Sequence, residues 1–237
     1  MANLFWIRRS RPFQLMWVAV LAAALGSIAA TATSAELSPA VAAWLAAQPK
    51  IDSWSADFVQ TRRLKSLTQP LIASGHVWFL APSRFRWELG RPAQTIAVRE
   101  PEVMLVIYPR LKRVERYPLT GEQTGPWRDA LALLEAGFPR SEAELKAQYN
   151  ILSQESKDGT VELALQPKSA AARKMMPRIT IDFDTKAYAL RSTVLQFADG
   201  STMRNDFKKP ELNPKIDPRL FEPQILSDYK VVEPLKK

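Results

Sequence analysis

Few residues in this 237-residue chain are of the types that enzymes use for catalysis. The chain has no cysteine and one histidine, His76, which excludes a thiol nucleophile, a zinc–thiolate site and a cluster of histidine ligands. Catalysis by His76 would need a nucleophile and an orienting carboxylate within hydrogen-bond reach. The sequence also contains no nucleotide-binding glycine motif, no zinc-protease motif and no serine-hydrolase motif. We therefore expect a structural role for His76 and no cofactor or metal.

Two carboxylates, Asp182 and Asp184, have the spacing of an acid–base pair. Asp182 lies within residues 178–183, and Asp184 directly follows this segment. The apolar and polar residues of the segment alternate as in a strand. Both would then point away from the apolar face and into water. A hydrolase built on carboxylates would need a polar cleft, so it is the least favoured of our functional hypotheses.

Residues 1–35 have the three parts of a secretory signal peptide. Three arginines before residue 12 form the positive region, residues 15–25 are apolar, and small residues continue to Ala35. The apolar stretch is short against the roughly 20 residues that span a bilayer, which favours cleavage over a membrane anchor. Cleavage fits after Ala32 or after Ala35, and we favour the second. We expect one domain over residues 36–237, in the periplasm.

The charge of the chain points to an anionic partner. The formal net charge is +9, and removal of three arginines and no acid with the signal peptide leaves +9 − 3 = +6. An exported protein does not meet nucleic acid, so a membrane surface or an acidic envelope protein is the more natural counterpart.

Hydrophobic periodicity predicts one helix followed mostly by strands. The clearest alternation lies in residues 84–89, where Phe85 and Trp87 oppose Arg84 and Arg86. The predicted helices are residues 40–48, 126–137 and 141–148. The predicted strands are residues 54–63, 75–80, 84–89, 95–99, 103–108, 112–117, 149–154, 161–166, 178–183, 189–198 and 203–208.

The fold class that follows is mainly β (α+β). Ten or so twisted antiparallel strands tend to curl, so we expect a curved antiparallel sheet that forms an incomplete β-barrel. Three short helices cannot cover both faces of such a sheet, and we expect them to act as a lid over an apolar cavity. The alternative is an interior filled by the protein's own side chains.

An ordered set of short motifs resembles the periplasmic outer-membrane lipoprotein carrier (LolA-like) family. The motifs follow the signal peptide and are densest in residues 54–118. They are Phe58-x-Gln60, Gly75-x-Val77-x-Phe79, Pro82-x-Arg84-Phe85-Arg86-Trp87, Pro92 with Gln94-Thr95-Ile96, Tyr108-Pro109 and Phe221-x-Pro223. The resemblance implies an incomplete barrel with a helical lid over an apolar cavity.

The resemblance also implies a function and partners. Such carriers take acylated lipoproteins from an inner-membrane ABC-type transporter and pass them to an acceptor at the outer membrane. A glycolipid or another acyl lipid is an alternative cargo, and a lipid-binding or envelope-sensing module is an alternative role. We expect a monomer whose cavity is lined by Phe58, Val77, Phe79, Phe85, Trp87, Ile96, Val98, Met104, Val106, Leu131, Leu134, Ile181 and Phe183.

Two positions depart from the family pattern. The family often has an arginine directly before the hairpin proline, where it holds the lid through hydrogen bonds to backbone carbonyls, and here that residue is Ala81. Residues 99–102 stand where the family has an Asp-Gly turn. Helix 126–137 is the candidate lid, and the sequence leaves open whether it is latched, with Arg84 or Arg86 in place of the missing arginine, or weakly held.

Overall fold

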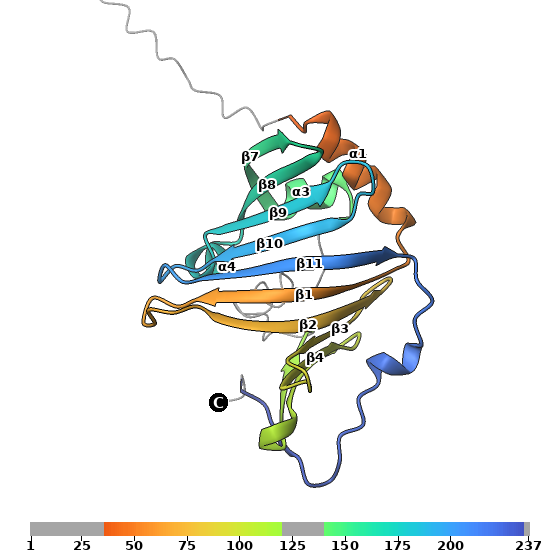
Figure 1. Cartoon of the computed structure of the whole chain (residues 1–237), viewed down its shortest axis with the longest axis vertical. Coiled ribbons are helices and arrows are strands. Elements are labelled where there is room, and N and C mark those ends of the chain that lie inside the picture. The colour runs from red at the N-terminus through yellow and green to blue at the C-terminus, as the bar shows by residue number, and fades with distance from the viewer. Residues whose placement is uncertain (1–35, 120–139, 235–237) are drawn as a thin grey trace, which may run out of the picture. The chain divides into compact units, whose positions relative to one another are not determined.

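The computed structural model describes residues 36–119 and 140–234. Twelve strands in this part form one sheet in the order β12-β6-β5-β4-β3-β2-β1-β11-β10-β9-β8-β7 (Figure 1). All neighbours are antiparallel except β12 and β6, which run parallel. The strands are β1 (Ser53–Arg63), β2 (Leu71–Leu80), β3 (Arg84–Leu89), β4 (Thr95–Arg99), β5 (Val103–Tyr108), β6 (Arg113–Pro118), β7 (Tyr149–Lys157), β8 (Thr160–Pro167), β9 (Arg178–Asp184), β10 (Leu190–Gln196), β11 (Thr202–Leu212) and β12 (Lys230–Val232).

The helices of the described part are short. The first, α1, begins where the hydroxyl of Ser38 accepts a hydrogen bond from the backbone N–H of Val41 (3.4 Å), and Pro39 occupies its first position. The elements are α1 (Pro39–Ala47), η1 (Gln48–Lys50), η2 (Pro109–Leu111), α3 (Glu142–Gln148), α4 (Ala170–Met175) and η3 (Pro218–Phe221).

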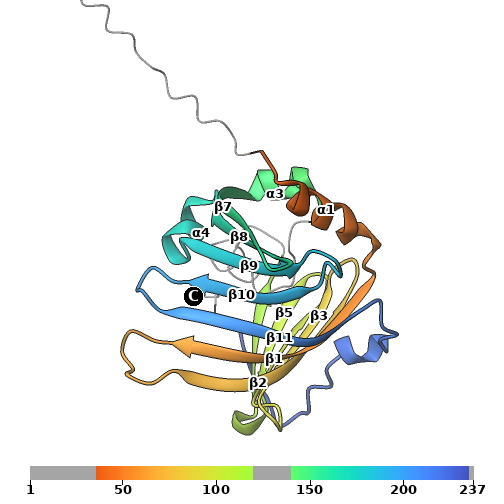
Figure 2. The ribbon, with the colours of Figure 1, turned by 45° about the horizontal axis from the view of Figure 1, so that its top comes forward.

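The predicted fold class is confirmed, because the sheet is curved and unclosed (Figure 2). The strand order makes β7 and β12 its two edges. Every strand predicted from periodicity is present, although β2 begins four residues earlier than expected, at Leu71. Helix α4 and strand β12 were not predicted. Both are too short to show a period, and β12 exists because the chain end pairs with β6. The predicted helix 126–137 and the signal peptide lie outside the described residues.

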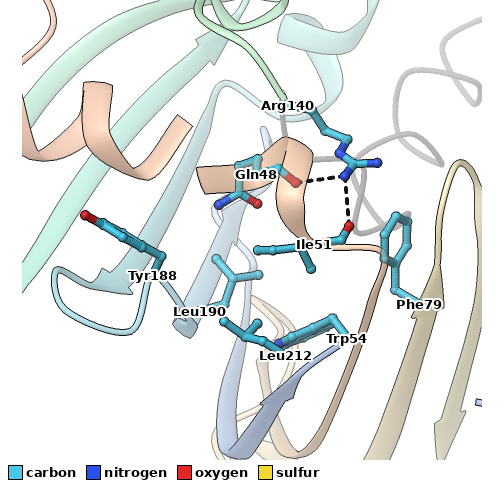
Figure 3. Close-up of a pocket in the computed structure, with 8 residues that line it drawn as sticks. All are labelled: Gln48, Ile51, Trp54, Phe79, Arg140, Tyr188, Leu190 and Leu212. Carbon is cyan, nitrogen blue, oxygen red and sulfur yellow. Dashed lines mark hydrogen bonds between the residues drawn. The ribbon is translucent and has the colours of Figure 1, made fainter. Parts of the chain in front are cut away.

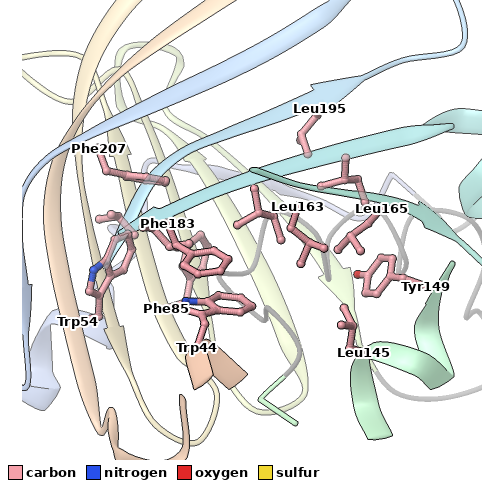
Figure 4. Close-up of a cluster of buried hydrophobic side chains, with 14 of the residues drawn as sticks. Trp44, Trp54, Phe85, Leu145, Tyr149, Leu163, Leu165, Phe183, Leu195 and Phe207 are labelled. Carbon is pink, nitrogen blue, oxygen red and sulfur yellow. The ribbon is translucent and has the colours of Figure 1, made fainter. Parts of the chain in front are cut away.

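Helix α1 packs on the concave face of the sheet. Its side chains Val41, Trp44 and Leu45 are buried, and the Trp44 ring stacks on Phe183 of β9 with ring centroids 4.7 Å apart (Figure 4). A nine-residue helix is marginal alone, so this apolar contact stabilises it. Much of the concave face is therefore already covered by the protein's own side chains, as in the filled-interior alternative.

The close packing of side chains on β1, β2 and β3 requires a glycine at position 75. The Phe58 ring lies 4.0 Å from the Trp87 ring, centroid to centroid, and it occupies the space over Gly75. A Cβ atom at Gly75 would lie 2.2 Å from the Phe58 ring and 2.2 Å from the carbonyl oxygen of Glu88. Any side chain at this position would displace the stacked rings of Phe58 and Trp87 from the sheet.

The convex face is also covered over β3–β6. The segment after β11 crosses this face through η3, and Arg86 donates a hydrogen bond to the carbonyl oxygen of Leu220 (2.9 Å). Phe221, the last residue of η3, is buried, with 2% of its surface exposed. A second set of buried apolar residues, outside the concave cluster, accompanies it: Val98, Val103, Ile107 and Val114. This half of the sheet is thus buried on both sides.

Candidate functional site

A pocket lies where α1 and η1 lead into β1, and we name it the mouth pocket (Figure 3). It contains about 460 Å³ of empty space, open solvent included. Half of its lining residues are apolar side chains from β1, β2, β10 and β11. The lining residues are Gln48, Ile51, Trp54, Phe79, Arg140, Tyr188, Leu190 and Leu212.

Arg140 binds backbone carbonyl groups at η1, beside the mouth pocket. Its Nη2 atom donates to the carbonyl oxygens of Gln48 (2.7 Å) and Ile51 (2.8 Å), as the dashed lines in Figure 3 show. Carbonyl groups at the end of a helix lack partners within the helix and carry partial negative charge, so a guanidinium group suits them well. We name these two bonds the Arg140 latch.

The position of Arg140 depends on the start of α3. Its backbone N–H donates to the Glu144 carboxylate (2.8 Å), and the Ser141 hydroxyl caps the helix by accepting from the Glu144 N–H (3.1 Å). The side chain of Arg140 is thereby directed from α3 towards η1. Sequence analysis missed this residue because the family pattern directed attention to Ala81. At Ala81, the backbone N–H instead donates to the carbonyl oxygen of Asp52 (2.7 Å).

The structure brings most of the predicted cavity residues to the concave face. Six of them are buried in the concave cluster, and three are partly buried against it. The buried residues are Phe58, Val77, Phe85, Met104, Ile181 and Phe183, and the partly buried ones are Phe79, Trp87 and Val106. Leu131 and Leu134 lie outside the described residues.

Two predicted cavity residues, Ile96 and Val98, need correction because they lie on the convex face. Val98 pairs with Arg86 and Ile96 pairs with Glu88, whereas Phe85 and Trp87 point to the concave side. The prediction assumed that the larger apolar residues of β4 face the interior. The C-terminal segment provides apolar cover on the convex side, so they face outward.

A row of buried polar side chains crosses the concave face between its apolar residues. The Gln60 side chain donates from Nε2 to Oδ1 of Asn205 (3.0 Å), and Nδ2 of Asn205 donates to Oγ1 of Thr193 (3.0 Å). The three residues are between 4% and 6% exposed. They connect β1, β11 and β10 at one level, so their pairing helps to fix the register of the central strands.

His76 lies on the convex face, away from the concave cluster. Its Nδ1 atom is 3.0 Å from Oδ1 of Asp57, which also accepts from Nη2 of Arg91 (2.6 Å). The hydrogen bond from His76 and the charge of Arg91 hold the pKa of the Asp57 carboxyl below its usual value. The ring of His76 packs against Trp78, with centroids 4.1 Å apart. These contacts give His76 a structural environment.

The paired carboxylates Asp182 and Asp184 also have structural partners. Asp182 accepts a hydrogen bond from the Ser192 hydroxyl (2.6 Å). Asp184 accepts from the backbone N–H groups of Lys186 and Ala187 and from the Arg191 guanidinium (2.6 Å), so it closes the β9–β10 turn. Within residues 36–119 and 140–234, no group of three acidic or histidine side chains is arranged to hold a metal ion.

The chain matches one protein family over most of its length. Residues 49–224 match the family described as "Outer membrane lipoprotein carrier protein LolA". The outer-membrane lipoprotein carrier protein of Chromohalobacter salexigens is 28% identical over 214 residues, which cover 89% of this chain and 95% of that protein. In the described part of the chain, no helix combines the length and apolar character needed to cross a bilayer.

The solved structures to which the chain is similar have low sequence identity to it. A LolA superfamily protein of Nitrosomonas europaea has a TM-score of 0.39 and 12% identity, over 75% of this chain and 95% of that one. A putative outer membrane lipoprotein-sorting protein domain of Vibrio parahaemolyticus has a TM-score of 0.42 and 11% identity, over 76% and 96% of the two chains.

Proposed function

Because the chain belongs to the outer membrane lipoprotein carrier protein LolA family, we propose that it carries acylated lipoproteins through the periplasm. The acyl chains would be held on the concave face and would enter at the mouth pocket. In this role the protein receives cargo from an inner-membrane ABC-type transporter and delivers it to an acceptor at the outer membrane. Neither step requires catalysis by this chain.

The observation that carries the proposal is the way α1 covers the concave face. Its apolar side chains occupy surface that acyl chains would also bind, and the Arg140 latch fixes its far end. Each buried methylene contributes about 0.8 kcal/mol, so several acyl chains on a free apolar surface would be held too tightly for release. Displacement of α1 costs part of this free energy, which makes binding reversible.

Release of lipoprotein from spheroplasts tests the proposal. The purified chain without residues 1–35 should release an acylated lipoprotein into the supernatant. It should not release an inner-membrane protein that is anchored by a transmembrane helix, and buffer alone should release neither protein. Release of both proteins, or of neither, by the chain would contradict the proposal. Mass spectrometry of the complex distinguishes lipoprotein from glycolipid or another acyl lipid.

A matched pair of variants ties this activity to the concave face. Phe79→Glu replaces an apolar wall of the mouth pocket by a charged carboxylate, which opposes the entry of acyl chains, and should abolish release. Trp78→Glu makes the same kind of change one residue earlier, on the opposite face of β2, and should retain release. Circular dichroism should show that both variants keep the β-sheet signal. Equal activity of the two variants would place the cargo elsewhere.

A further inference from the structure

The turn between β1 and β2 exposes large apolar side chains at the end of the sheet. We name residues 62–72 the hairpin tip. Within it, Leu67 is 46% exposed, Leu71 is 48% exposed and Ile72 is 65% exposed. Three of the eight large apolar side chains that are exposed in the described residues lie within this stretch of eleven residues, and such a local concentration is typical of a site of interaction. The hairpin tip therefore has the composition of a contact surface.

Three basic side chains accompany these apolar residues. Arg62, Arg63 and Lys65 are exposed, and none of them forms an ion pair with another described residue. The carboxylate of Asp199, in the β10–β11 turn, interacts with the charge of Lys65. Because residues 62–72 contain no acidic residue, the three cations outweigh this carboxylate, and the positive charge that remains favours an anionic partner.

The direction of the side chains decides the kind of partner. Leu71 lies opposite Arg62 on the concave side of the hairpin, and Ile72 lies opposite Thr61 on the convex side. Leu67 lies beyond both, in the turn itself. Apolar groups therefore project on both faces and at the end of the tip. A protein surface would contact one face, whereas the interfacial region of a bilayer surrounds an inserted tip on all sides.

We propose that the hairpin tip docks on a membrane surface that contains anionic phospholipid. Leu67, Leu71 and Ile72 enter the boundary between headgroups and acyl chains, and the three cations behind them bind lipid phosphates. This proposal does not rest on the carrier function, since it concerns the β1–β2 turn and not the mouth pocket.

The hairpin tip lies at the opposite end of β1 from α1, as Figures 1 and 2 both show. Strand β1 runs from Ser53, next to the pocket, to Arg63 at the tip, a distance of roughly 33 Å at about 3.3 Å per residue. Docking through the tip therefore leaves the mouth pocket accessible to a protein partner.

Vesicle flotation tests the proposal with the chain lacking residues 1–35, because all twelve strands of the sheet lie after residue 52. The protein should float with vesicles of phosphatidylcholine mixed with phosphatidylglycerol. It should bind vesicles of pure phosphatidylcholine weakly. Arg62→Ser with Arg63→Ser should weaken binding to the anionic vesicles about 25-fold, at roughly fivefold for each cation. Leu67→Glu with Ile72→Glu should abolish binding.

Two controls separate the tip from the rest of the surface. Leu226→Glu changes a residue that is 61% exposed in the C-terminal segment and should leave binding unchanged. Arg110→Ser with Arg116→Ser removes two exposed cations from another turn and strand and should also leave it largely unchanged. If the Arg110→Ser, Arg116→Ser variant lost as much vesicle binding as the Arg62→Ser, Arg63→Ser variant, binding would depend on net charge and the proposal would be overturned. Unchanged binding of the Leu67→Glu, Ile72→Glu variant would overturn it as well.

A labelling experiment keeps the proposal testable if a charged variant fails to fold. Because the chain has no cysteine, Ile72→Cys gives a single site for an environment-sensitive fluorophore. Anionic vesicles should shift its emission to shorter wavelength, and a label at Leu226→Cys should not respond. Absence of a shift at residue 72 would show that the tip stays in water.

Discussion

The Trp44 indole and the Phe183 ring lie nearly parallel, at an interplanar angle of 14°. This stack joins the only long described helix, α1, to the concave face of the sheet at β9. Its two members come from parts of the chain 139 residues apart, so it also ties the start of the domain to its second half. If α1 moves to admit cargo, this contact must break.

Replacement of Trp44 by alanine should separate stability from binding. Loss of the buried indole, which is 1% exposed, should lower the free energy of unfolding by about 3–5 kcal/mol. The same change removes a competitor for the concave face, so a fluorescent fatty acid should bind more tightly. Urea denaturation and fluorescence titration measure the two effects. Weaker binding in a folded variant would show that Trp44 lines the cargo site instead of covering it.

The Arg140 latch should control the rate at which acyl ligands exchange. Arg140→Met keeps most of the stem but removes both hydrogen bonds to the carbonyls of Gln48 and Ile51, and should destabilise the protein by about 1–3 kcal/mol. Stopped-flow exchange of a fluorescent acyl ligand should become faster. Arg173→Met is the control, because Arg173 donates to the carbonyls of Pro167 and Lys168 beside α4. Equal acceleration in both variants would argue against a latch.

The buried polar row should show strong coupling between its members. Gln60→Leu leaves Oδ1 of Asn205 without its donor, and Asn205→Leu leaves the Gln60 amide without its acceptor. Each single change should cost about 1–3 kcal/mol, because a buried polar group loses its partner. The triple variant Gln60→Leu, Asn205→Leu, Thr193→Val should cost less than the sum of the single changes. Additive losses in urea denaturation would show that the row acts as separate contacts.

Stability should fall at acid pH partly through Asp184. Hydrogen bonds from the Ala187 N–H, the Arg191 guanidinium and the Lys186 N–H lower the pKa of this carboxyl from 3.8 to about 2. The folded state therefore favours the ionised form. This stabilisation is complete above about pH 4 and is lost as the pH falls towards 2. The melting temperature of Asp184→Asn should lie below that of the parent at neutral pH. This difference in melting temperature should shrink as the pH falls from about 4 towards 2. A constant difference would contradict this assignment.

The alternation of apolar residues was enough to predict the strands and the curved sheet, because one face of most strands packs on a single interior. Residues 84–89 show this most clearly: Phe85 and Trp87 lie on the concave side, as their spacing predicts. Strand β4 is an exception to this rule. Its apolar residues Ile96 and Val98 face a C-terminal segment that joins the fold more than 100 residues later, and no local pattern carries that information.

The candidate site was predicted in its apolar part only. Burial on a strand follows from periodicity, so residues such as Phe58 and Phe183 could be assigned to the interior. The Arg140 latch joins a side chain next to α3 to carbonyl groups about 90 residues earlier, and backbone carbonyls have no sequence signature. The register of β1 with β11, which places Gln60 beside Asn205, likewise depends on a long-range pairing.

The pairing of β1 with β11 also has a consequence for how the chain acquires its structure. The paired residues are far apart in sequence, from 139 positions (Arg63 with Thr202) to 158 positions (Trp54 with Leu212). Contacts between such distant segments form slowly, because a long loop must close before they are gained. A chain that emerges with its N-terminus first therefore cannot complete the centre of its sheet until nearly all of it has appeared. Until β11 has appeared, the runs β1–β6 and β7–β10, whose strands pair with their neighbours in sequence, remain two separate sheets, so the concave interior that they share stays open.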